Sequence, residues 1–170
     1  AVRTYGGLNL PAAVLETPGF PGSIETQAVP MGGEIMGAGA GDRFSLAIEA
    51  QADPKSGYLD RIQVVKGWID ATGETRERVY DAAWSGDDRL QPDGSLAAVG
   101  SSVDLKTGLT ANTIGSPRLT AVWQDPEFDP AQSAFYYVRV LQIPTARHSL
   151  LDKLALGDED IDTRRPDTIQ

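Results

Sequence analysis

Short segments with the two-residue periodicity of β-strands, separated by turns rich in glycine and proline, constrain this fold more than any other feature. Residues 43–50 (RFSLAIEA) alternate apolar and polar side chains, as expected for a strand with one buried face. A turn over residues 53–57 (DPKSG) ends the segment. Because such segments recur and only one weak helical pattern is found, we predict a mainly β fold, an antiparallel β-sandwich.

Two neighbouring segments predict a β-hairpin. Residues 59–69 place Ile62, Val64 and Trp68 on one face. Residues 76–84 likewise place Tyr80, Ala82 and Trp84 on one face. Gly73 in the connection between them suits the left-handed position of a type I turn with a bulge. Shorter strands are expected over residues 98–105 and 119–124.

The strongest strand pattern lies over residues 135–143 (FYYVRVLQI), which are mostly β-branched or aromatic and predict a central strand. The turn before it is similar to the corner of immunoglobulin-like sandwiches in which a tyrosine hydroxyl bonds back to the preceding turn. We expect Tyr136 or Tyr137 to take this structural role. The predicted sandwich therefore has an immunoglobulin-like tendency.

The three tryptophans allow two interpretations, core packing or a platform for stacking sugars. Trp68 and Trp84 lie on predicted strands among alternating apolar residues, where aromatic side chains usually pack across strands. We assign both a structural role. Trp123 is the candidate for an aromatic residue that faces a ligand.

Composition changes along the chain predict three regions. Residues 1–41 are rich in glycine and proline without a sustained period, which predicts an irregular arm or linker that holds at most a short strand. Residues 42–145 hold the predicted β-sandwich domain. Residues 146–170 combine a short amphipathic helix, ended by Gly157, with a charged tail.

The charge of the chain argues against polyanionic partners. Fifteen basic and 24 acidic residues give a formal net charge of −9, which repels nucleic acids and anionic membrane surfaces. No apolar run is long enough for a membrane span, so we expect no membrane insertion. The chain has no cysteine, which excludes disulfides and thiolate metal sites.

The glycine-rich stretch 30–44 (PMGGEIMGAGAGDRF) does not fit a phosphate-binding loop. Gly37 and Gly39 supply the first two glycines of a G-x-G-x-x-G dinucleotide fingerprint, but Asp42 stands where the third glycine is required. A strand is also expected to follow where the fingerprint requires a helix. A nucleotide-binding P-loop would need a Gly-Lys-Ser/Thr ending, which is missing. We interpret the stretch as a connection into the next strand.

Other catalytic and metal-binding patterns are incomplete. His148 is the only histidine, and no nucleophile elbow accompanies it, so it is expected to be a solvated side chain. Asp158, Asp160 and Asp162 begin like a calcium loop, but Thr163 stands where glycine is required. We assign no catalytic, cofactor-binding or metal-ligating residue to this chain. With 24 acidic residues, a carboxylate pair for glycoside hydrolysis cannot be selected from the sequence.

Three stretches resemble the C-terminal part of a bacterial family catalogued as domain of unknown function 3604. They are YLDRIQVVKGWIDATGETRERVYDAAWSG, NTIGSPRLTAVWQDPEFDP and AQSAFYYVRVLQIPTAR, which run almost without gaps over residues 58–147. Residues 30–35 (PMGGEI) match the family's approach to this region.

This resemblance implies a cellular location, a neighbouring domain and a metal for the parent protein. Longer family members are mostly exported, and their N-terminal portion resembles metal-dependent barrels of the polymerase-and-histidinol-phosphatase type. The resemblance therefore implies a periplasmic or secreted location, a preceding catalytic barrel in the same parent chain as partner, and a divalent metal held by that barrel. The family's metal ligands precede the region matched, so no catalytic position carries over.

We therefore expect a noncatalytic accessory β-domain that forms the C-terminal part of an exported metal-dependent hydrolase of unknown substrate. A carbohydrate- or ligand-binding β-sandwich module is the alternative from a different class, and a hydrolase built on scattered carboxylates is a third. An unpaired strand at a sheet edge would also allow self-association through that edge.

Overall fold

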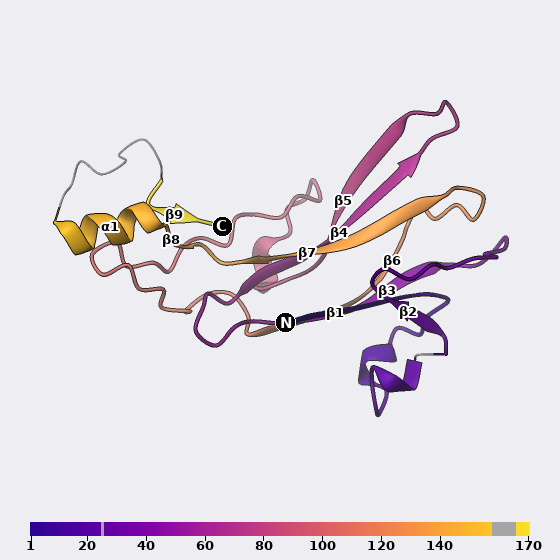
Figure 1. Ribbon diagram of the computed structural model, residues 1–170, viewed down its shortest axis with the longest axis horizontal. Helices are drawn as coiled ribbons and strands as arrows, with labels where there is room; N and C mark the ends of the chain where they lie inside the picture. Colours follow the sequence, from indigo (N-terminus) through magenta and orange to yellow (C-terminus); the bar gives the residue numbers. More distant parts are fainter. Residues whose placement is uncertain (25, 158–165) are drawn as a thin grey trace. The chain divides into compact units, whose positions relative to one another are not determined.

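The computed structural model describes residues 1–24, 26–157 and 166–170 and is mainly β, with one short α-helix near the C-terminus (Figure 1). The chain divides into two compact units, which we call unit 1 and unit 2. Unit 1 comprises Ala1–Ala50, Ile62–Ala83 and Leu119–Val140, and unit 2 comprises Gln51–Arg61, Trp84–Arg118 and Leu141–Gln170. No helix of the described residues is both long and apolar enough to cross a membrane.

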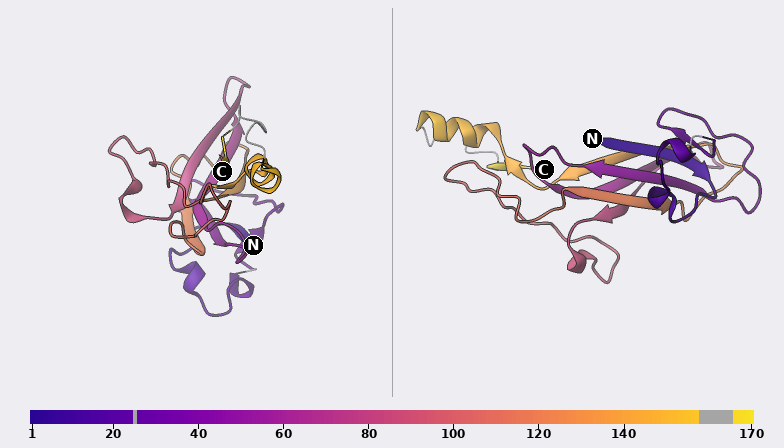
Figure 2. Two further views of the ribbon diagram at one scale, coloured as in Figure 1. Left: turned by 90° about the vertical axis from the view of Figure 1, so that its left-hand side faces the viewer. Right: turned by 90° about the horizontal axis from the view of Figure 1, so that it is seen from below.

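A four-stranded sheet lies mostly in unit 1. Its strand order is β2 (Ala28–Pro30), β1 (Val2–Leu8), β3 (Phe44–Gln51) and β6 (Arg118–Gln124). β1 pairs antiparallel with both neighbours, and the two strands β1 and β3 run side by side in Figure 2. β3 and β6 agree with the strands predicted from periodicity to within one residue.

The second sheet has three strands in the order β5 (Thr75–Trp84), β4 (Leu59–Ile69) and β7 (Ala134–Gln142). β4 and β5 form the predicted hairpin. The prediction of β7 as a central strand was wrong, because among the described residues β7 lies at the edge of this sheet. Its apolar residues misled the prediction, since several of them face solvent.

The two sheets face each other in unit 1 through large side chains. Phe44 of β3 stacks on Tyr136 of β7 with ring centroids 4.2 Å apart. Leu46 and Ile48 of β3, and Ile62 and Val64 of β4, are buried. An antiparallel sandwich is thus present, while its immunoglobulin-like character stays a prediction.

β3 is buried on both faces, although its alternation predicts one buried face. Phe44, Leu46 and Ile48 occupy one face, and Ala47 on the opposite face is also fully buried. The segment between β1 and β2 covers that opposite face with two short 3-10 helices, η1 (Val14–Glu16) and η2 (Gly22–Ile24) (Figure 1). The small Ala47 side chain leaves room for their apolar residues.

The N-terminal region therefore contains more regular structure than the sequence indicates. β1 pairs with β3 over seven residues, and β2 adds a short edge. The strand pattern of β1 is weak because Gly6 and Gly7 carry no side chains. Glycine is required at position 7, where a Cβ atom would lie 2.7 Å from the Gln27 carbonyl oxygen.

Unit 2 consists mostly of connections. It contains η3 (Asp87–Arg89), α1 (His148–Leu156) and the paired two-residue strands β8 (Thr145–Ala146) and β9 (Thr168–Ile169). Gly157 ends α1 in the left-handed conformation, as predicted. The strand expected over residues 98–105 was wrong, since only an isolated bridge between Val103 and Thr110 forms there.

Candidate functional site

Charged and aromatic side chains converge inside unit 1, between the facing sheets. We call this group the inner cluster; it consists of Lys66, Tyr80, Trp123, Asp125, Glu127 and Tyr136. Lys66 comes from β4, Tyr80 from β5, Trp123 from β6 and Tyr136 from β7. The two carboxylates follow β6 directly in the chain. The cluster thus joins strands of both sheets.

Asp125 is the centre of the inner cluster, and its side chain is fully buried. Its Oδ2 atom accepts hydrogen bonds from Lys66 Nζ at 2.6 Å and from the Tyr136 hydroxyl at 2.7 Å. Its Oδ1 atom accepts a bond from the Glu127 backbone N–H at 2.9 Å. Lys66 also donates to the Glu127 carbonyl oxygen at 2.8 Å. A buried charge pair needs such additional bonds to offset the loss of hydration.

Glu127 is a second, more exposed carboxylate of the cluster. Its Oε2 atom accepts a hydrogen bond from the Tyr80 hydroxyl at 2.9 Å, and its Oε1 atom accepts one from Arg78 at 2.5 Å. These bonds from Tyr80 and Arg78 lower the pKa of Glu127. Glu127 is therefore a carboxylate at neutral pH and is bound to two donors.

Both cluster tyrosines remain protonated far above neutral pH. Burial, reinforced by the bond to Glu127, raises the pKa of Tyr80 to about 12. Burial and the nearby Asp125 carboxylate raise the pKa of Tyr136 as well. A tyrosine with a raised pKa donates a hydrogen bond and does not act as a base near neutral pH.

Aromatic rings fill the rest of the inner cluster. The half-buried Trp123 contacts Tyr80 at 5.1 Å and Tyr136 at 6.2 Å between ring centroids. The Lys66 ammonium lies 5.3 Å from the ring centroid of Trp68, in cation–π geometry. Chemically, the inner cluster is a network in which acids, cation and hydroxyls bind one another. Such a network holds two sheets together.

The opposite side of the three-stranded sheet is different, and we call it the outer face; it consists of Gln63, Gly67, Asp81, Phe135, Tyr137 and Arg139. Phe135 is 62% exposed and Tyr137 is 41% exposed. Their rings are parallel to within 9°, with centroids 6.5 Å apart. The outer face therefore presents two large aromatic rings to solvent.

Hydrogen bonds to Asp42 fix the end of the glycine-rich stretch. The Asp42 carboxylate accepts a hydrogen bond from the Gly39 backbone N–H at 2.8 Å and from the Asn9 amide at 2.7 Å. These two bonds lower the pKa of Asp42. The backbone N–H of Gly39 is thus bound to a carboxylate of the same loop. The stretch leads directly into β3, as its interpretation as a connection requires.

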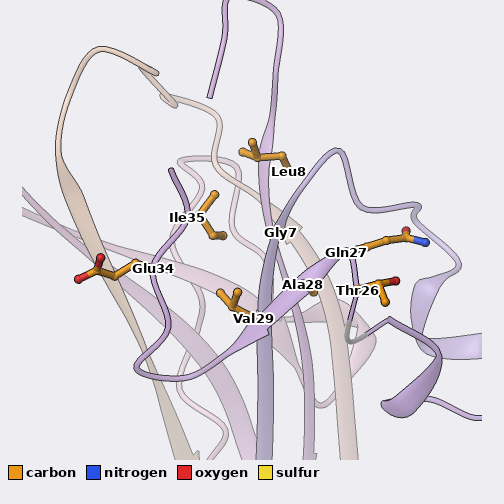
Figure 3. Close-up of a pocket in the computed structure, with 8 residues that line it drawn as sticks. All are labelled: Gly7, Leu8, Thr26, Gln27, Ala28, Val29, Glu34 and Ile35. Carbon is orange, nitrogen blue, oxygen red and sulfur yellow. The ribbon is translucent and has the colours of Figure 1, made fainter. Parts of the chain in front are cut away.

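A shallow pocket of about 270 Å³ lies beside β2, next to the start of the glycine-rich stretch (Figure 3). Its lining residues are Gly7, Leu8, Thr26, Gln27, Ala28, Val29, Glu34 and Ile35. Glu34 is the ionisable side chain among them, and Figure 3 shows it well separated from Thr26 and Gln27. This lining offers no second acid or base for general acid–base chemistry.

Unit 2 has its own buried carboxylate. Asp60 is fully buried, and its Oδ2 atom accepts hydrogen bonds from Arg61 Nε at 2.9 Å and from the Gln170 amide at 2.6 Å. Arg89 lies 2.6 Å from the other oxygen and donates to the carbonyl oxygens of Ser85 and Ala97. The Asp60 carboxylate therefore connects distant segments of unit 2.

The remaining candidates occupy structural positions. Trp84 is the last residue of β5 and is half-buried, while Gly73 has a left-handed φ of +86° in the hairpin turn. Tyr136, and not Tyr137, forms a hydrogen bond to the segment that precedes β7. His148 is exposed at the first residue of α1. The calcium-loop residues 158–163 lie outside the described part of the chain.

Within residues 1–24, 26–157 and 166–170, no three His, Cys, Asp or Glu side chains are grouped closely enough to hold a metal ion. The buried pair of Lys66 and Asp125 was not predicted from the sequence. One signal could have revealed it, because Lys66 has the same strand parity as the apolar residues Ile62, Val64 and Trp68. A charged residue at such a position predicts a buried partner.

Comparison with known proteins gives one match. The model of the family described as "Protein of unknown function (DUF3604)" matches residues 1–170. The match therefore also includes residues 1–29, which precede the stretches whose sequence resembles the family. No curated protein and no solved structure matches the chain.

Proposed function

Since the chain belongs to the family of proteins of unknown function DUF3604, we propose that it works as a noncatalytic accessory β-domain, the C-terminal part of an exported metal-dependent hydrolase. The inner cluster is the observation that carries this proposal. Its carboxylates, ammonium and hydroxyls bind one another, which suits a scaffold better than a reaction centre.

The chemistry of the inner cluster supports a holding role. A nucleophile or general base needs a reactive atom that is free to meet substrate. The Lys66 ammonium, however, is bound to Asp125 and to a backbone carbonyl, and its side chain is only 3% exposed. A rigid sandwich of this kind can carry loops or a flat face beside a catalytic domain.

The resemblance of the sequence supports further proposals about the setting. We place the parent protein in the periplasm or outside the cell, with the divalent metal in a preceding barrel that contacts this domain. The edge strand β7 is nine residues long, and we propose that its backbone pairs with an edge strand of a second copy.

A hydrolysis assay tests the accessory role. The purified chain is expected to release no product from generic phosphoesters in the presence of manganese or zinc, whereas the parent protein with its preceding barrel is expected to do so. Turnover by the chain alone that disappears in Asp125→Asn would contradict the proposal. Met36→Ala is the control, since Met36 is 84% exposed and belongs to neither the inner cluster nor the outer face.

A second candidate function, a carbohydrate- or ligand-binding module, is supported by a separate observation. Phe135 and Tyr137 expose two parallel rings on the outer face. Exposed aromatic pairs with polar neighbours are common features of binding surfaces. This candidate is compatible with an accessory role in a hydrolase.

A further inference from the structure

We propose that the outer face binds a neutral glycan chain, which stacks on Phe135 and Tyr137 and forms hydrogen bonds to Arg139, Gln63 and Asp81. This inference deepens the second candidate function and does not depend on membership of a hydrolase. It rests on the geometry of the rings, on the polar row beside them and on the charge of the surface.

The two exposed rings lie parallel to each other along β7. Phe135 and Tyr137 occupy alternate positions of the strand, so both side chains project from the same side of the sheet. Their ring planes differ by only 9° and their centroids are 6.5 Å apart. Two parallel rings can each contact one of two successive sugar units, because the C–H groups of a pyranose meet the negative face of an aromatic ring.

The absence of a side chain at Gly67 lets the Phe135 ring lie against the sheet. A Cβ atom at position 67 would lie 2.3 Å from the Cζ atom of Phe135, so the ring occupies the space that any larger residue on β4 would fill. The ring leans across from β7 onto the backbone of β4. Backbone contact of this kind fixes the ring orientation before a ligand binds, which reduces the entropic cost of binding.

Polar side chains continue the outer face beyond the rings. Arg139 donates from Nε and from one terminal nitrogen to the Gln63 amide oxygen, at 2.9 and 2.7 Å. The Gln63 amide nitrogen donates to Asp81 at 2.8 Å. Arg139, Gln63 and Asp81 thus form a row across three strands, in which planar groups alternate as donors and acceptors. Pairs of sugar hydroxyls can bind to such planar groups.

The charges favour a neutral ligand over an anionic one. The polar row contains one acid and one base joined by an amide, so it is balanced overall. The whole chain has a formal net charge of −9, which repels nucleic acids, anionic membranes and uronate polymers. A neutral sugar chain can approach the polar row without this repulsion.

Binding is tested by titration calorimetry of the purified chain with neutral and anionic oligosaccharides. The probes are cellohexaose, xylohexaose and laminarihexaose, with oligogalacturonate as the anionic comparison. We expect measurable binding of at least one neutral probe. Phe135→Ala with Tyr137→Ala should raise its Kd by about tenfold or more, because aromatic residues at the centre of a binding surface dominate affinity.

Three further variants make the test specific. Phe135→Tyr keeps the ring and should retain binding, and Gly67→Ala should weaken binding because the added methyl group displaces the Phe135 ring. Met36→Ala removes an apolar side chain that is 84% exposed elsewhere in unit 1 and should change nothing. Thermal unfolding of each variant shows that the fold is intact.

The outcomes separate this inference from the accessory role. Absence of binding to every neutral probe, or equal affinity after loss of both rings, would overturn it and leave the hydrolysis assay unaffected. Tighter binding of oligogalacturonate would overturn the choice of a neutral ligand. Concentration-dependent assembly that is lost in the double alanine variant, without glycan binding, would instead assign the face to a second copy of the chain.

Discussion

The two sides of the three-stranded sheet are built from the same strands but differ in burial and chemistry. On the inner side, Lys66 and Tyr136 bind the buried Asp125 carboxylate, and their polar atoms are satisfied within the protein. On the outer side, Phe135 and Tyr137 are exposed to solvent. The comparison teaches that the polar groups of the inner side hold the protein together, while the outer side, where we propose a binding function, leaves its aromatic rings exposed.

Neighbouring residues make this contrast sharp. Tyr136 and Tyr137 are adjacent in β7, yet they project to opposite sides because successive side chains of a strand alternate. Equivalent substitutions at adjacent positions therefore compare the two sides within one strand. The predictions below test the contribution of the inner cluster to stability, in order of decreasing effect.

Removal of the Lys66 ammonium should cause the largest loss of stability. Lys66→Ala leaves the Asp125 charge buried without its cationic partner, and we expect a loss of about 3–5 kcal/mol of unfolding free energy. Urea or thermal unfolding measures the loss. Arg139→Ala on the outer face is the control and should change stability by less than about 0.5 kcal/mol. Equal losses in the two variants would remove the distinction between the sides.

Removal of one hydroxyl should have an intermediate effect. Tyr136→Phe deletes the hydrogen bond to Asp125 and keeps the ring that stacks on Phe44. We expect a loss of about 1.5–3 kcal/mol, the range for a hydrogen bond to a charged group. Tyr137→Phe is the matched control at the next position and should be nearly neutral. A larger loss in Tyr137→Phe would contradict the assignment of the faces.

The smallest effect should appear at alkaline pH. The pKa of Tyr80 is raised to about 12 in the folded protein, against about 10 for an unfolded tyrosine. Its contribution to stability is therefore complete below pH 10 and is lost as the pH rises toward 12. Unfolding free energies measured from pH 9 to 12 should fall less steeply in Tyr80→Phe. An identical slope in the variant and the original protein would refute this contribution.

The strands were largely predictable because their periodicity survives in the sequence. β4 begins and ends at the predicted residues, and β5 and β7 differ by one residue at each shifted end. β1 was not predicted as a sheet strand, since Gly6 and Gly7 interrupt its alternation. The strand expected over residues 98–105 did not form, because local propensity does not supply a pairing partner.

The candidate site was less predictable than the strands. The expectation that Trp123 faces a ligand stays a prediction. In the structure its half-buried ring packs against Tyr80 and Tyr136, and the most exposed rings are Phe135 and Tyr137. Sequence parity separated Tyr136 from Tyr137. It could not say which parity faces the second sheet, because that depends on how the two sheets pack.

The sequence by itself determined most of the strands, the hairpin with Gly73, the helix that ends at Gly157 and the negative net charge, since each follows from local periodicity, turn chemistry or composition. Only the tertiary structure decided that Lys66 meets Asp125, that the N-terminal segment covers β3, and that Phe135 lies over Gly67. These contacts join residues far apart in the chain. They depend on how the sheets pack, on the shape and charge of the facing side chains, and a local sequence pattern contains no information about either.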